Sequence, residues 1–566
     1  MRGRWSFPPP VVLGLWVLLG VSLAFHLLWL IRFRHSSLTE WDEAGYIQIA
    51  VLDRVGLAHD GLIGLARAVL HQPGEAPLVP FLAVPVYLVA GTGVFQSLFV
   101  LPVLSTVLVL ATYGLARRLT SPAWSLLAAL AVAGLPAVID YTRLFHFAVP
   151  ATTFATLALW ALLGSDGMRR RGPMLAAGVF VALMVLSRTM TLAYLPGFAL
   201  AAGVQLIGRR DLPARAANLG LASLLAAAVA ATWYAPNAGS VRSYLVDAGY
   251  GASSGSFGAS HPVLSFAYWS KELNLVVQQL YGPLALVVAA CLLAGIASVL
   301  VTGAYRRCSS HRCLAALALA AFVVEGYLVL TSSSNEGTAF ALPWLPALVV
   351  LAVGGAARAR PGALRPALAV LLASAAVLGI AMKSGFAPAL ARAHSVPVPL
   401  LDDVPILNGR GIIQEEVAGA GYPIGDPTEP LPAMHRRWLP VAQRVTEYVV
   451  ARADRMKVSP EVLVAMDDGL MSNTRFRLAA ALSSGLYLPV GTLTAAEGGD
   501  RTGAYATKLR ESGATTLVTA PAAPGAAHTV NQENVAAAAS AVGFRPARSF
   551  TLPDGRRLEV WWRGGG

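Results

Sequence analysis

The stretch VVLGLWVLLGVSLAFHLLWLI, residues 11–31, decides the class of this protein. It is an apolar run of 21 residues, which is long enough to cross the hydrocarbon core of a bilayer as one helix. Arg2 and Arg4 precede it and no small-residue cleavage site follows it. The run is too long for a signal-peptide core, so we expect a retained first transmembrane span.

The composition of the whole chain agrees with a membrane protein. Of its 566 residues, 56% are hydrophobic and only 13% are charged, whereas soluble domains carry about 25% charged residues. The net charge of +13 comes from arginines clustered between apolar segments. Such clusters fix membrane topology, so nucleic acid is not an expected partner, while membrane lipids are.

Ten further apolar segments bring the predicted total to about eleven transmembrane helices. They lie near residues 97–116, 122–139, 147–164, 174–186, 190–207, 216–233, 281–303, 313–331, 338–356 and 366–382. The stretch 77–90 is excluded because Pro77, Pro80 and Pro85 interrupt it and because counting it would reverse every later loop. We expect it to be a helix in, or dipping into, the outer interface.

The distribution of arginine predicts a multi-pass protein of the cell membrane with its N-terminus in the cytoplasm. Alternate loops are rich in arginine, and we place them in the cytoplasm: Arg117 and Arg118; Arg169, Arg170 and Arg171; Arg209, Arg210 and Arg215; Arg306, Arg307 and Arg312; Arg358, Arg360 and Arg365. The first outer loop (32–96), the turns 140–146 and 331–337, the loop 234–280 and everything after residue 383 then lie outside.

The sequence predicts two domains, a transmembrane domain at 1–383 and an extracytoplasmic α/β domain at 384–566. In the second, strand-like runs at 462–465, 515–519 and 558–562 alternate with helical runs at 473–484 and 532–542, each followed by glycine. Pro553-Asp554-Gly555 is typical of the turn of a terminal hairpin.

Two of the three cysteines, Cys308 and Cys313, flank His311 in a loop that this topology places in the cytoplasm. A disulfide is therefore not expected there. The irregular spacing of these three residues also makes a metal site the less favoured interpretation.

The first outer loop contains an acidic motif, Thr39-Glu40-Trp41-Asp42-Glu43-Ala44-Gly45-Tyr46. Carboxylates held beside hydrocarbon are costly and usually functional. A partly desolvated carboxylate at the outer surface, its pKa raised, can take a proton from a hydroxyl nucleophile. The alternative is a helix start, with Thr39 as N-cap and the acids in the first turn.

The run HQPGEAPL, residues 71–78, lies later in the same loop and supplies His71 and Glu75. Together with Asp42 or Glu43 these side chains could form a mixed oxygen and nitrogen site for a divalent metal, although the spacing matches no specific motif. Loop structure alone also explains the prolines and the glycine.

Arg188 follows an apolar segment of only 13 residues, 174–186, which gives about 20 Å of helix against a hydrocarbon thickness of about 30 Å. The turn after it should lie below the outer surface, at the depth of a lipid phosphate. A guanidinium buried there requires an anion, either a protein carboxylate or a phosphate. Arg143, in the same outer turn as His146, either serves this pocket or is an exposed loop arginine.

The loop 234–280 is rich in glycine and aromatic residues, among them Tyr244 and Tyr250. Aromatic faces suit sugar rings, but they are also common at membrane interfaces. Composition does not decide between these two roles.

Residues 1 to about 383 resemble the GT-C glycosyltransferases of family 39 type, which include protein O-mannosyltransferases and the lipid A aminoarabinose transferase. The resemblance rests on these elements: Asp42-Glu43-x-x-Tyr46, the run 71–78, Leu186-Ser187-Arg188, Trp233-Tyr234-Ala235-Pro236-Asn237 with Tyr250-Gly251, and Leu342-Pro343-Trp344-Leu345-Pro346. The run 71–78 departs from the His-Pro-Pro-Leu pattern of the family, which puts that contact in question.

The resemblance implies a membrane glycosyltransferase that moves a hexosyl or pentosyl group from a polyprenyl-phosphate carrier to a hydroxyl of a glycan, lipid or protein, on the outer face and with inversion. It implies Asp42 as the base and Glu43 as a helper that orients the acceptor or a metal. Arg188 would stabilise the departing phosphate. Tyr46, His71, Glu75, Arg143, His146 and Tyr250 are the other expected substrate-binding residues.

Two other classes of protein remain open from the residues. A polytopic transporter also has buried charges, but common transporter folds show paired halves or matching broken helices, and this chain has no visible repeat. A membrane-anchored sensor or binding protein would act through the C-terminal domain, and its activity would survive the substitution Asp42→Ala.

Overall fold

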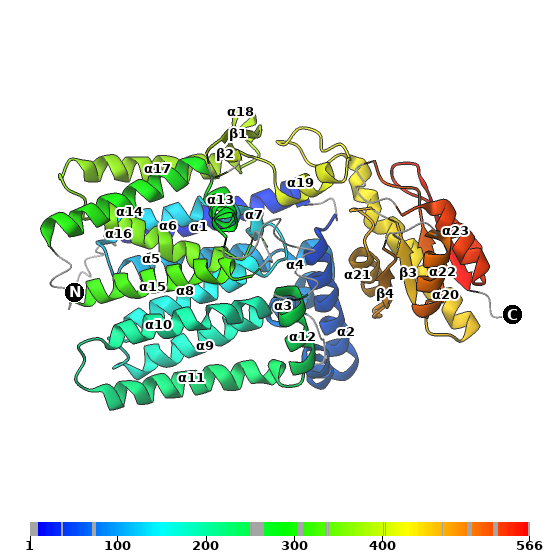
Figure 1. The fold of residues 1–566 in the computed structure, drawn as a ribbon, viewed down its shortest axis with the longest axis horizontal. Helices are drawn as coiled ribbons and strands as arrows, with labels where there is room; N and C mark the ends of the chain where they lie inside the picture. Colours follow the sequence, from blue (N-terminus) through cyan, green and yellow to red (C-terminus); the bar gives the residue numbers. More distant parts are fainter. Residues whose placement is uncertain are drawn as a thin grey trace, which may run out of the picture. The chain divides into compact units, whose positions relative to one another are not determined.

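The computed structural model describes residues 9–34, 38–70, 75–249, 251, 265–303, 310–333, 337, 339–399, 401, 403–466, 468–494, 501–524 and 530–563. The chain divides into two compact units that are each built from several segments (Figure 1). The helical unit comprises residues 1–28, 69–79 and 100–409, and the α/β unit comprises residues 29–68, 80–99 and 410–566. The predicted domains, 1–383 and 384–566, stay a prediction.

Within the described residues, seven helical segments are long and apolar enough to span a membrane. They are α1 (Pro10–Phe33), α4 with α5 (Val94–Ser97 and Val100–Ala116), η2 with α10 (Thr189–Tyr194 and Leu195–Leu206), α11 (Leu212–Tyr234), α14 (Gly282–Thr302), α15 (His311–Thr331) and α17 (Leu364–Met382). A pair bent by 59°, α6 (Pro122–Ala133) and α7 (Pro136–Thr142), makes an eighth span if it is counted as one.

The remaining three predicted spans are shorter apolar helices: α8 (Ala148–Gly164), α9 (Arg171–Ser187), and η5 (Leu342–Trp344) with α16 (Leu345–Ala356). Each of the eleven predicted segments thus coincides with an apolar helix or helix pair, and the prediction of a polytopic helical membrane protein is confirmed. The proline-containing segment 77–90, which was not counted as a span, forms the short helix α3 (Leu78–Ala90), with Pro85 inside it.

Close helix packing holds the helical unit together. Helix α8 packs against α5 and α9, α9 against α11, and α10 against α15. Helices α14 and α16 meet at Gly295 and Gly355, where a Cβ on Gly295 would lie 2.5 Å from the Cα of Gly355. Small residues at such contacts allow close approach of helices in lipid, where burial of apolar side chains supplies little drive.

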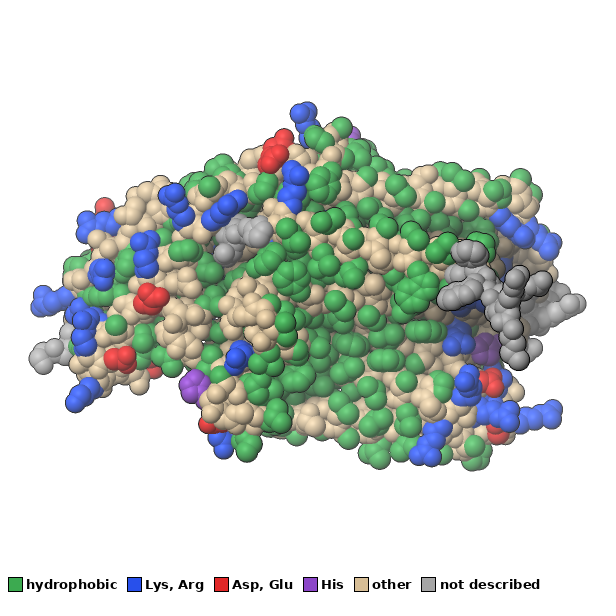
Figure 2. Space-filling view, turned by 180° about the vertical axis from the view of Figure 1, so that it is seen from behind, with side chains coloured by type: hydrophobic (Ala, Val, Ile, Leu, Met, Phe, Trp, Pro, Cys, Tyr) green, Lys and Arg blue, Asp and Glu red, His purple; other side chains and the backbone are tan. Residues whose placement is uncertain are grey.

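Apolar side chains also cover much of the surface of these helices. Leu224 on α11, Leu286 and Leu293 on α14 and Val370 on α17 are each more than 60% exposed. Figure 2 shows one face, on which hydrophobic side chains spread over a broad area with few charged groups among them. A surface of this kind suits contact with lipid tails.

The helical unit also contains elements outside the predicted spans. They are α12 (Ala238–Gly249), α13 (Phe266–Leu280), α18 (Pro388–Ala391) and an antiparallel pair of strands, β1 (His394–Pro397) and β2 (Asp403–Leu407). Helices α12 and α13 make up most of the described part of the predicted outer loop 234–280.

The α/β unit is built on a five-stranded sheet of order β4-β3-β5-β7-β6. The strands are β3 (Val462–Ala465), β4 (Val490–Thr492), β5 (Thr516–Thr519), β6 (Phe544–Thr551) and β7 (Arg557–Arg563). Strand β3 pairs in parallel with β4 and β5, whereas β7 pairs antiparallel with β5 and β6. Every residue of β3 and β5 is buried, as expected for central strands covered on both faces.

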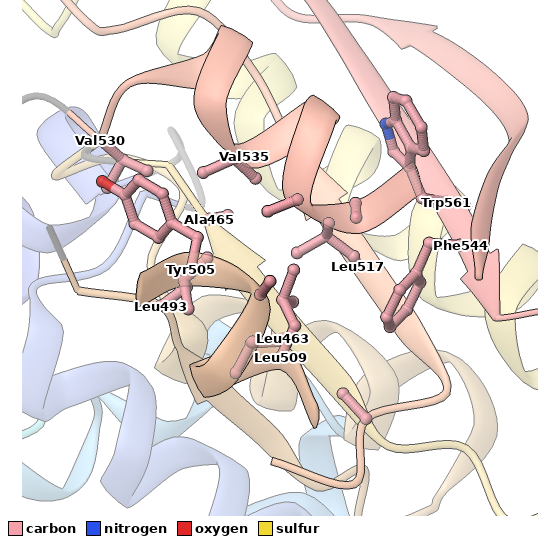
Figure 3. Packing of buried hydrophobic residues seen from close by; sticks show 14 residues of the cluster. Leu463, Ala465, Leu493, Tyr505, Leu509, Leu517, Val530, Val535, Phe544 and Trp561 are labelled. Atoms are coloured by element: carbon pink, nitrogen blue, oxygen red, sulfur yellow. The ribbon is translucent and has the colours of Figure 1, made fainter. Parts of the chain in front are cut away.

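A hydrophobic core lies between this sheet and two helices, α22 (Arg501–Glu511) and α23 (Gln532–Ala541) (Figure 3). Leu463 and Leu517 reach it from the sheet, Tyr505 and Leu509 from α22, and Val535 from α23. The unit's other elements after residue 410 are α19 (Ile412–Gly419), η6 (Ala433–Arg437), α20 (Trp438–Met456) and α21 (Asn473–Ser484).

The predicted elements of this region are confirmed as an α/β domain. Strand β3 and helix α21 have the predicted bounds, and α21 ends at Gly485 with φ +67°. Gly555, with φ +88°, lies in the predicted turn between β6 and β7. These two strands form the predicted terminal hairpin. Strand β4 and the helices α20 and α22 were not predicted.

Two features of the remaining chain differ from expectation. The first outer loop contains α2 (Trp41–Leu70), a helix of 30 residues with non-helical angles at Asp60 and Gly61. Only its first turn was anticipated. Cys313 is disulfide-bonded, so the expectation of no disulfide in that loop is wrong; Cys308 lies outside the described residues, and Cys291 is a buried free thiol.

Candidate active site

Arg188 lies at a break between two helices of the helical unit. Helix α9 ends at Ser187, Arg188 is extended (φ −158°, ψ 130°), and the 3-10 helix η2 begins at Thr189. Helix α9 has 17 residues and begins at Arg171, earlier than predicted. The side chain of Arg188 is nevertheless buried, with the residue 8% exposed.

The side chains of Glu75, Tyr244 and Phe147 lie around the guanidinium of Arg188. Its Nη1 lies 3.3 Å from Oε2 of Glu75, and its Nη2 donates a hydrogen bond of 2.8 Å to the hydroxyl of Tyr244. Its Cζ lies 4.2 Å from the ring centroid of Phe147, within the range of a cation–π interaction. The predicted need for an anion is thus met in part by a protein carboxylate, whose own side chain is 36% exposed.

Arg188 also lines a cavity of about 320 Å³ that lies wholly within the helical unit. Most of the wall is apolar and comes from α8 and its N-cap Phe147, from η2 and α15, and from Phe340, just before η5, and Pro343, within it. A guanidinium in an otherwise apolar wall suits a ligand that has one anionic group and a hydrocarbon part.

His146 and Arg143 precede Phe147 closely in the sequence, and both are buried. The ring of His146 stacks on Tyr141, with centroids 4.9 Å apart, and lies 4.0 Å from the ring of Phe147. Its Nδ1 accepts from the backbone N–H of Ala148 at the start of α8. Arg143 is 3% exposed and its Cζ lies 5.2 Å from the Phe25 ring centroid. The alternative of an exposed loop arginine is therefore wrong.

The motif Trp233-Tyr234-Ala235-Pro236-Asn237 supports the cluster through backbone contacts. The Tyr234 hydroxyl donates to the carbonyl of Val185, near the end of α9, at 2.7 Å. Asn237 Nδ2 donates to the carbonyl of Leu70 at 2.8 Å, just before the run that carries Glu75. Trp233 is 1% exposed and packs against Leu186. These contacts fix the two segments that supply Glu75 and Arg188.

The acidic motif belongs to the α/β unit and forms the start of α2. Glu40 and Glu43 cap the helix reciprocally: the Glu43 N–H donates to Oε2 of Glu40 at 3.0 Å, and the Glu40 N–H donates to Oε2 of Glu43 at 3.2 Å. This is the geometry of a capping box. Glu40, rather than Thr39, is therefore the N-cap, and its carbonyl accepts from the N–H of Ala44.

Glu43 is fully buried and forms an ion pair of 2.7 Å with Arg34, whose side chain is 3% exposed. Tyr46, one turn later, is also fully buried. Asp42 is half-buried. Of the two predicted acids, Glu43 thus has contacts that fix the helix start, while Asp42 keeps access to solvent.

Burial raises the pKa of three carboxyl groups in this region, those of Glu40, Glu416 and Asp53. Burial, together with the charges of Asp42 and Glu416, raises the pKa of Glu40 to about 8. Burial also raises the pKa of Glu416, although the adjacent Arg475 opposes the shift. Asp53, on α2, is fully buried and accepts no hydrogen bond from the described residues, and burial raises its pKa to about 7. The charges of Asp42 and Glu416 thus favour the protonated form of Glu40.

The predicted site residues thus fall into two groups. In the helical unit, Arg188 and His146 lie against Phe147 and Glu75 pairs with Arg188, while Arg143 lies against Phe25. Asp42, Glu43 and Tyr46 lie in the first two turns of α2 in the α/β unit. His71 and Tyr250 lie outside the described residues.

Sequence reasoning missed several residues around these groups: Arg34, Glu40, Glu416, Arg475 and the specific role of Tyr244. The sequence signal for Glu40 was its position three residues before Glu43, because this is the spacing of a capping box. For a divalent metal, no three His, Cys, Asp or Glu side chains come together among the residues that the structure describes.

Comparison with known proteins shows the fold. The structure of ArnT from Cupriavidus metallidurans in the apo state superposes with a TM-score of 0.55 at 15% sequence identity, covering 96% of this chain and 97% of that one. The chain has the GT-C fold. ArnT from the same organism bound to undecaprenyl phosphate gives a TM-score of 0.51 at 15% identity, with 98% of each chain covered.

A second GT-C protein has a similar fold. The oligosaccharyltransferase AglB from Archaeoglobus fulgidus, in complex with an inhibitory peptide and a dolichol-phosphate, gives a TM-score of 0.52 at 13% identity, covering 98% of this chain and 74% of that one. The sequence family described as dolichyl-phosphate-mannose-protein mannosyltransferase matches residues 72–234, a stretch that contains Glu75 and Arg188. No curated protein matches the sequence.

Proposed function

We propose that this protein is a membrane glycosyltransferase that moves a sugar from a polyprenyl-phosphate carrier to an acceptor hydroxyl. One observation carries the proposal: in a GT-C fold, the buried guanidinium of Arg188 lines an apolar cavity of about 320 Å³. A polyprenyl phosphate combines an anionic head with a hydrocarbon chain, and this cavity offers a partner to each. The GT-C structures of ArnT and AglB that hold undecaprenyl phosphate and dolichol-phosphate support the same ligand class.

The environment of Arg188 suits reversible binding of a phosphate. Glu75 lies 3.3 Å from Nη1, which is a long contact, and its side chain is partly exposed. A phosphate can replace this carboxylate as the partner of the guanidinium, because a bidentate phosphate forms two charge-assisted hydrogen bonds. Phe147 covers one face of the group and limits hydration, which strengthens its interaction with an anion.

In the proposed reaction, Asp42 takes the proton of the acceptor hydroxyl while the acceptor oxygen forms a bond to the anomeric carbon of the sugar. The bond between that carbon and the phosphate oxygen of the carrier breaks, and the phosphate keeps the electron pair. Arg188 stabilises the resulting charge. A single displacement of this kind inverts the anomeric configuration. Glu43, held by Arg34, fixes the helix that carries Asp42.

The arginine-rich loops support an orientation with the N-terminus in the cytoplasm and with the acidic motif and the C-terminal region outside. Cysteines placed at two exposed positions, Asp60 on α2 and Arg210 beside α11, test it. In intact cells, a membrane-impermeant maleimide should label the first and not the second; the opposite pattern contradicts this orientation.

The reaction itself is tested with the purified full-length protein in lipid nanodiscs and a panel of radiolabelled polyprenyl-phosphate sugars. We expect transfer of label from at least one donor to an acceptor in a membrane extract, and an inverted anomeric centre in the product by NMR. A retained configuration contradicts the single displacement. Failure of every donor to bind or react contradicts the proposed function.

A further inference from the structure

Arg475 connects the C-terminal part of the α/β unit to the acidic motif. It lies on α21, in the first turn, where the hydroxyl of Ser472 caps the helix by accepting from the Arg475 N–H. The residue is 4% exposed. Its Nε donates to the carbonyl of Thr39 at 3.0 Å, and its Nη2 donates to the same oxygen. Arg475 and Thr39 are 436 positions apart in the chain.

The carbonyl of Thr39 has a special place in the helix start. The first acceptor within α2 is the carbonyl of Glu40, which binds the N–H of Ala44. Thr39 precedes this cap, so its carbonyl takes no part in the helix ladder, and the residue is 2% exposed. A buried carbonyl without a donor is costly. The guanidinium of Arg475 satisfies it from outside the helix.

The other contacts of Arg475 hold the guanidinium in place. Nη1 donates to the carbonyl of Gly469, and Nη2 lies 2.6 Å from Oε1 of Glu416 on α19. A guanidinium is planar, so partners on several sides fix both its position and its plane. The preceding carbonyl, that of Leu38, is bound in turn by Nη1 of Arg34 at 3.0 Å. Two arginines therefore bind the two successive carbonyls before the helix cap.

We infer that Arg475 is a positioning residue for the proposed sugar transfer, through which the C-terminal α/β region fixes the start of α2 and thereby the carboxylate of Asp42. This inference rests on the proposed function. Asp42 lies three residues after Thr39, on a turn whose backbone is bound at Leu38, Thr39 and Glu40. A catalytic group misplaced by about 1 Å loses about 10²-fold in rate. The C-terminal region would then be part of the catalytic apparatus, without contacting substrate.

The test compares Arg475→Ala with Arg475→Lys and with the control Arg477→Ala in the full-length protein. Arg477 lies on the same helix, and its Nη2 donates to the carbonyl of Val490. The control removes the same charge and one backbone contact without involving Thr39. Three quantities are measured: kcat and donor KM for transfer, affinity for a short-chain polyprenyl phosphate, and hydrogen exchange of the amides of residues 40–46.

For Arg475→Ala we expect kcat to fall about 10²-fold, while donor KM and phosphate affinity stay within about twofold. Exchange at residues 40–46 should rise about tenfold or more, because the helix start opens locally. Arg475→Lys should recover part of kcat, since an ammonium can still donate to the Thr39 carbonyl. Arg477→Ala should change none of these quantities.

Unchanged exchange at residues 40–46 in Arg475→Ala overturns the inference, as does unchanged kcat when exchange has risen. If Arg475→Ala does not fold, Arg475→Lys and Glu416→Gln provide milder losses of the same contacts. Wild-type kcat and wild-type exchange at residues 40–46 in both of these variants would overturn the inference. A wild-type protein that transfers no sugar contradicts the proposed function and with it the catalytic part of this inference. The exchange measurement still decides separately whether Arg475 holds the start of α2.

Discussion

Arg188 in the helical unit and Arg475 in the α/β unit are both buried arginines, but their partners differ in kind. Arg188 contacts the side chains of Tyr244, Phe147 and the partly exposed Glu75, and it lines a cavity. Arg475 contacts the backbone carbonyls of Thr39 and Gly469 and the carboxylate of Glu416. Side chains beside a cavity can change partner when a ligand enters, whereas backbone carbonyls cannot without unfolding. The first pattern suits binding and the second suits positioning.

The largest effect expected in the α/β unit is that of Asp42→Asn, because it removes the proposed base and leaves the helix cap intact. We expect kcat to fall about 10²- to 10⁴-fold with donor affinity unchanged. Asp60→Asn is the matched control, since Asp60 is an exposed acid on the same helix and its side chain is 60% exposed. Single-turnover transfer at saturating donor measures the effect. Equal rates for Asp42→Asn and the control would exclude Asp42 as the base.

The next effect is on stability. Glu43→Ala leaves the guanidinium of Arg34 buried without its carboxylate partner and also removes half of the capping box. We expect the free energy of unfolding to fall by about 3 to 5 kcal/mol, as for other buried pairs that lose one partner.

Thermal unfolding of Glu43→Ala, Glu43→Gln and the wild type measures this change. The amide of glutamine keeps an acceptor for Arg34 and for the Glu40 N–H, so Glu43→Gln should lose less stability than Glu43→Ala. Wild-type stability in Glu43→Ala would show that the Arg34 pair does not hold the start of α2, and would weaken the contrast between the two units.

The eleven apolar segments and the outline of the C-terminal domain follow from local pattern. Runs of about 20 apolar residues and β-rich runs such as 462–465 report on their surroundings without any partner. The contacts that shape the candidate site are not local. Arg475 reaches Thr39 across 436 positions, and nothing in the sequence near either residue indicates the pairing.

The acidic motif also shows that local sequence does not identify the partners of a side chain. The run 39–46 indicated both chemistry and a helix cap, and the structure contains the cap. The buried Glu43 is neutralised by Arg34, which lies 9 positions earlier, outside the motif. Whether an acid is free for chemistry depends on such a partner, which sequence spacing alone does not identify.

The smallest effect concerns Asp53, a buried carboxyl on α2 that accepts no hydrogen bond from the part of the chain that the structure describes. Its pKa is about 7 in the folded protein and about 3.8 as the unperturbed value. The unfolded chain therefore releases its proton at lower pH than the folded protein, so stability is lost as pH rises from about 4 to about 7. We expect Asp53→Asn to raise the Tm at pH 8 by about 2 to 4 °C and to leave it unchanged near pH 4.

Asp60→Asn, which removes an exposed acid from the same helix, is again the control. It should leave the Tm unchanged both at pH 8 and near pH 4. A Tm difference between Asp53→Asn and the wild type that is independent of pH would mean that ionisation of Asp53 does not limit the stability of α2.

The most direct test of the contrast between the two arginines is the affinity of a short-chain polyprenyl phosphate for Arg188→Ala and Arg475→Ala, measured side by side in nanodiscs by isothermal titration calorimetry. If Arg188 binds the phosphate and Arg475 only positions α2, Kd should rise about 10- to 100-fold in Arg188→Ala, as expected for loss of a charge-assisted contact, and stay at the wild-type value in Arg475→Ala. Wild-type affinity in Arg188→Ala, or equal losses in both variants, would contradict the account.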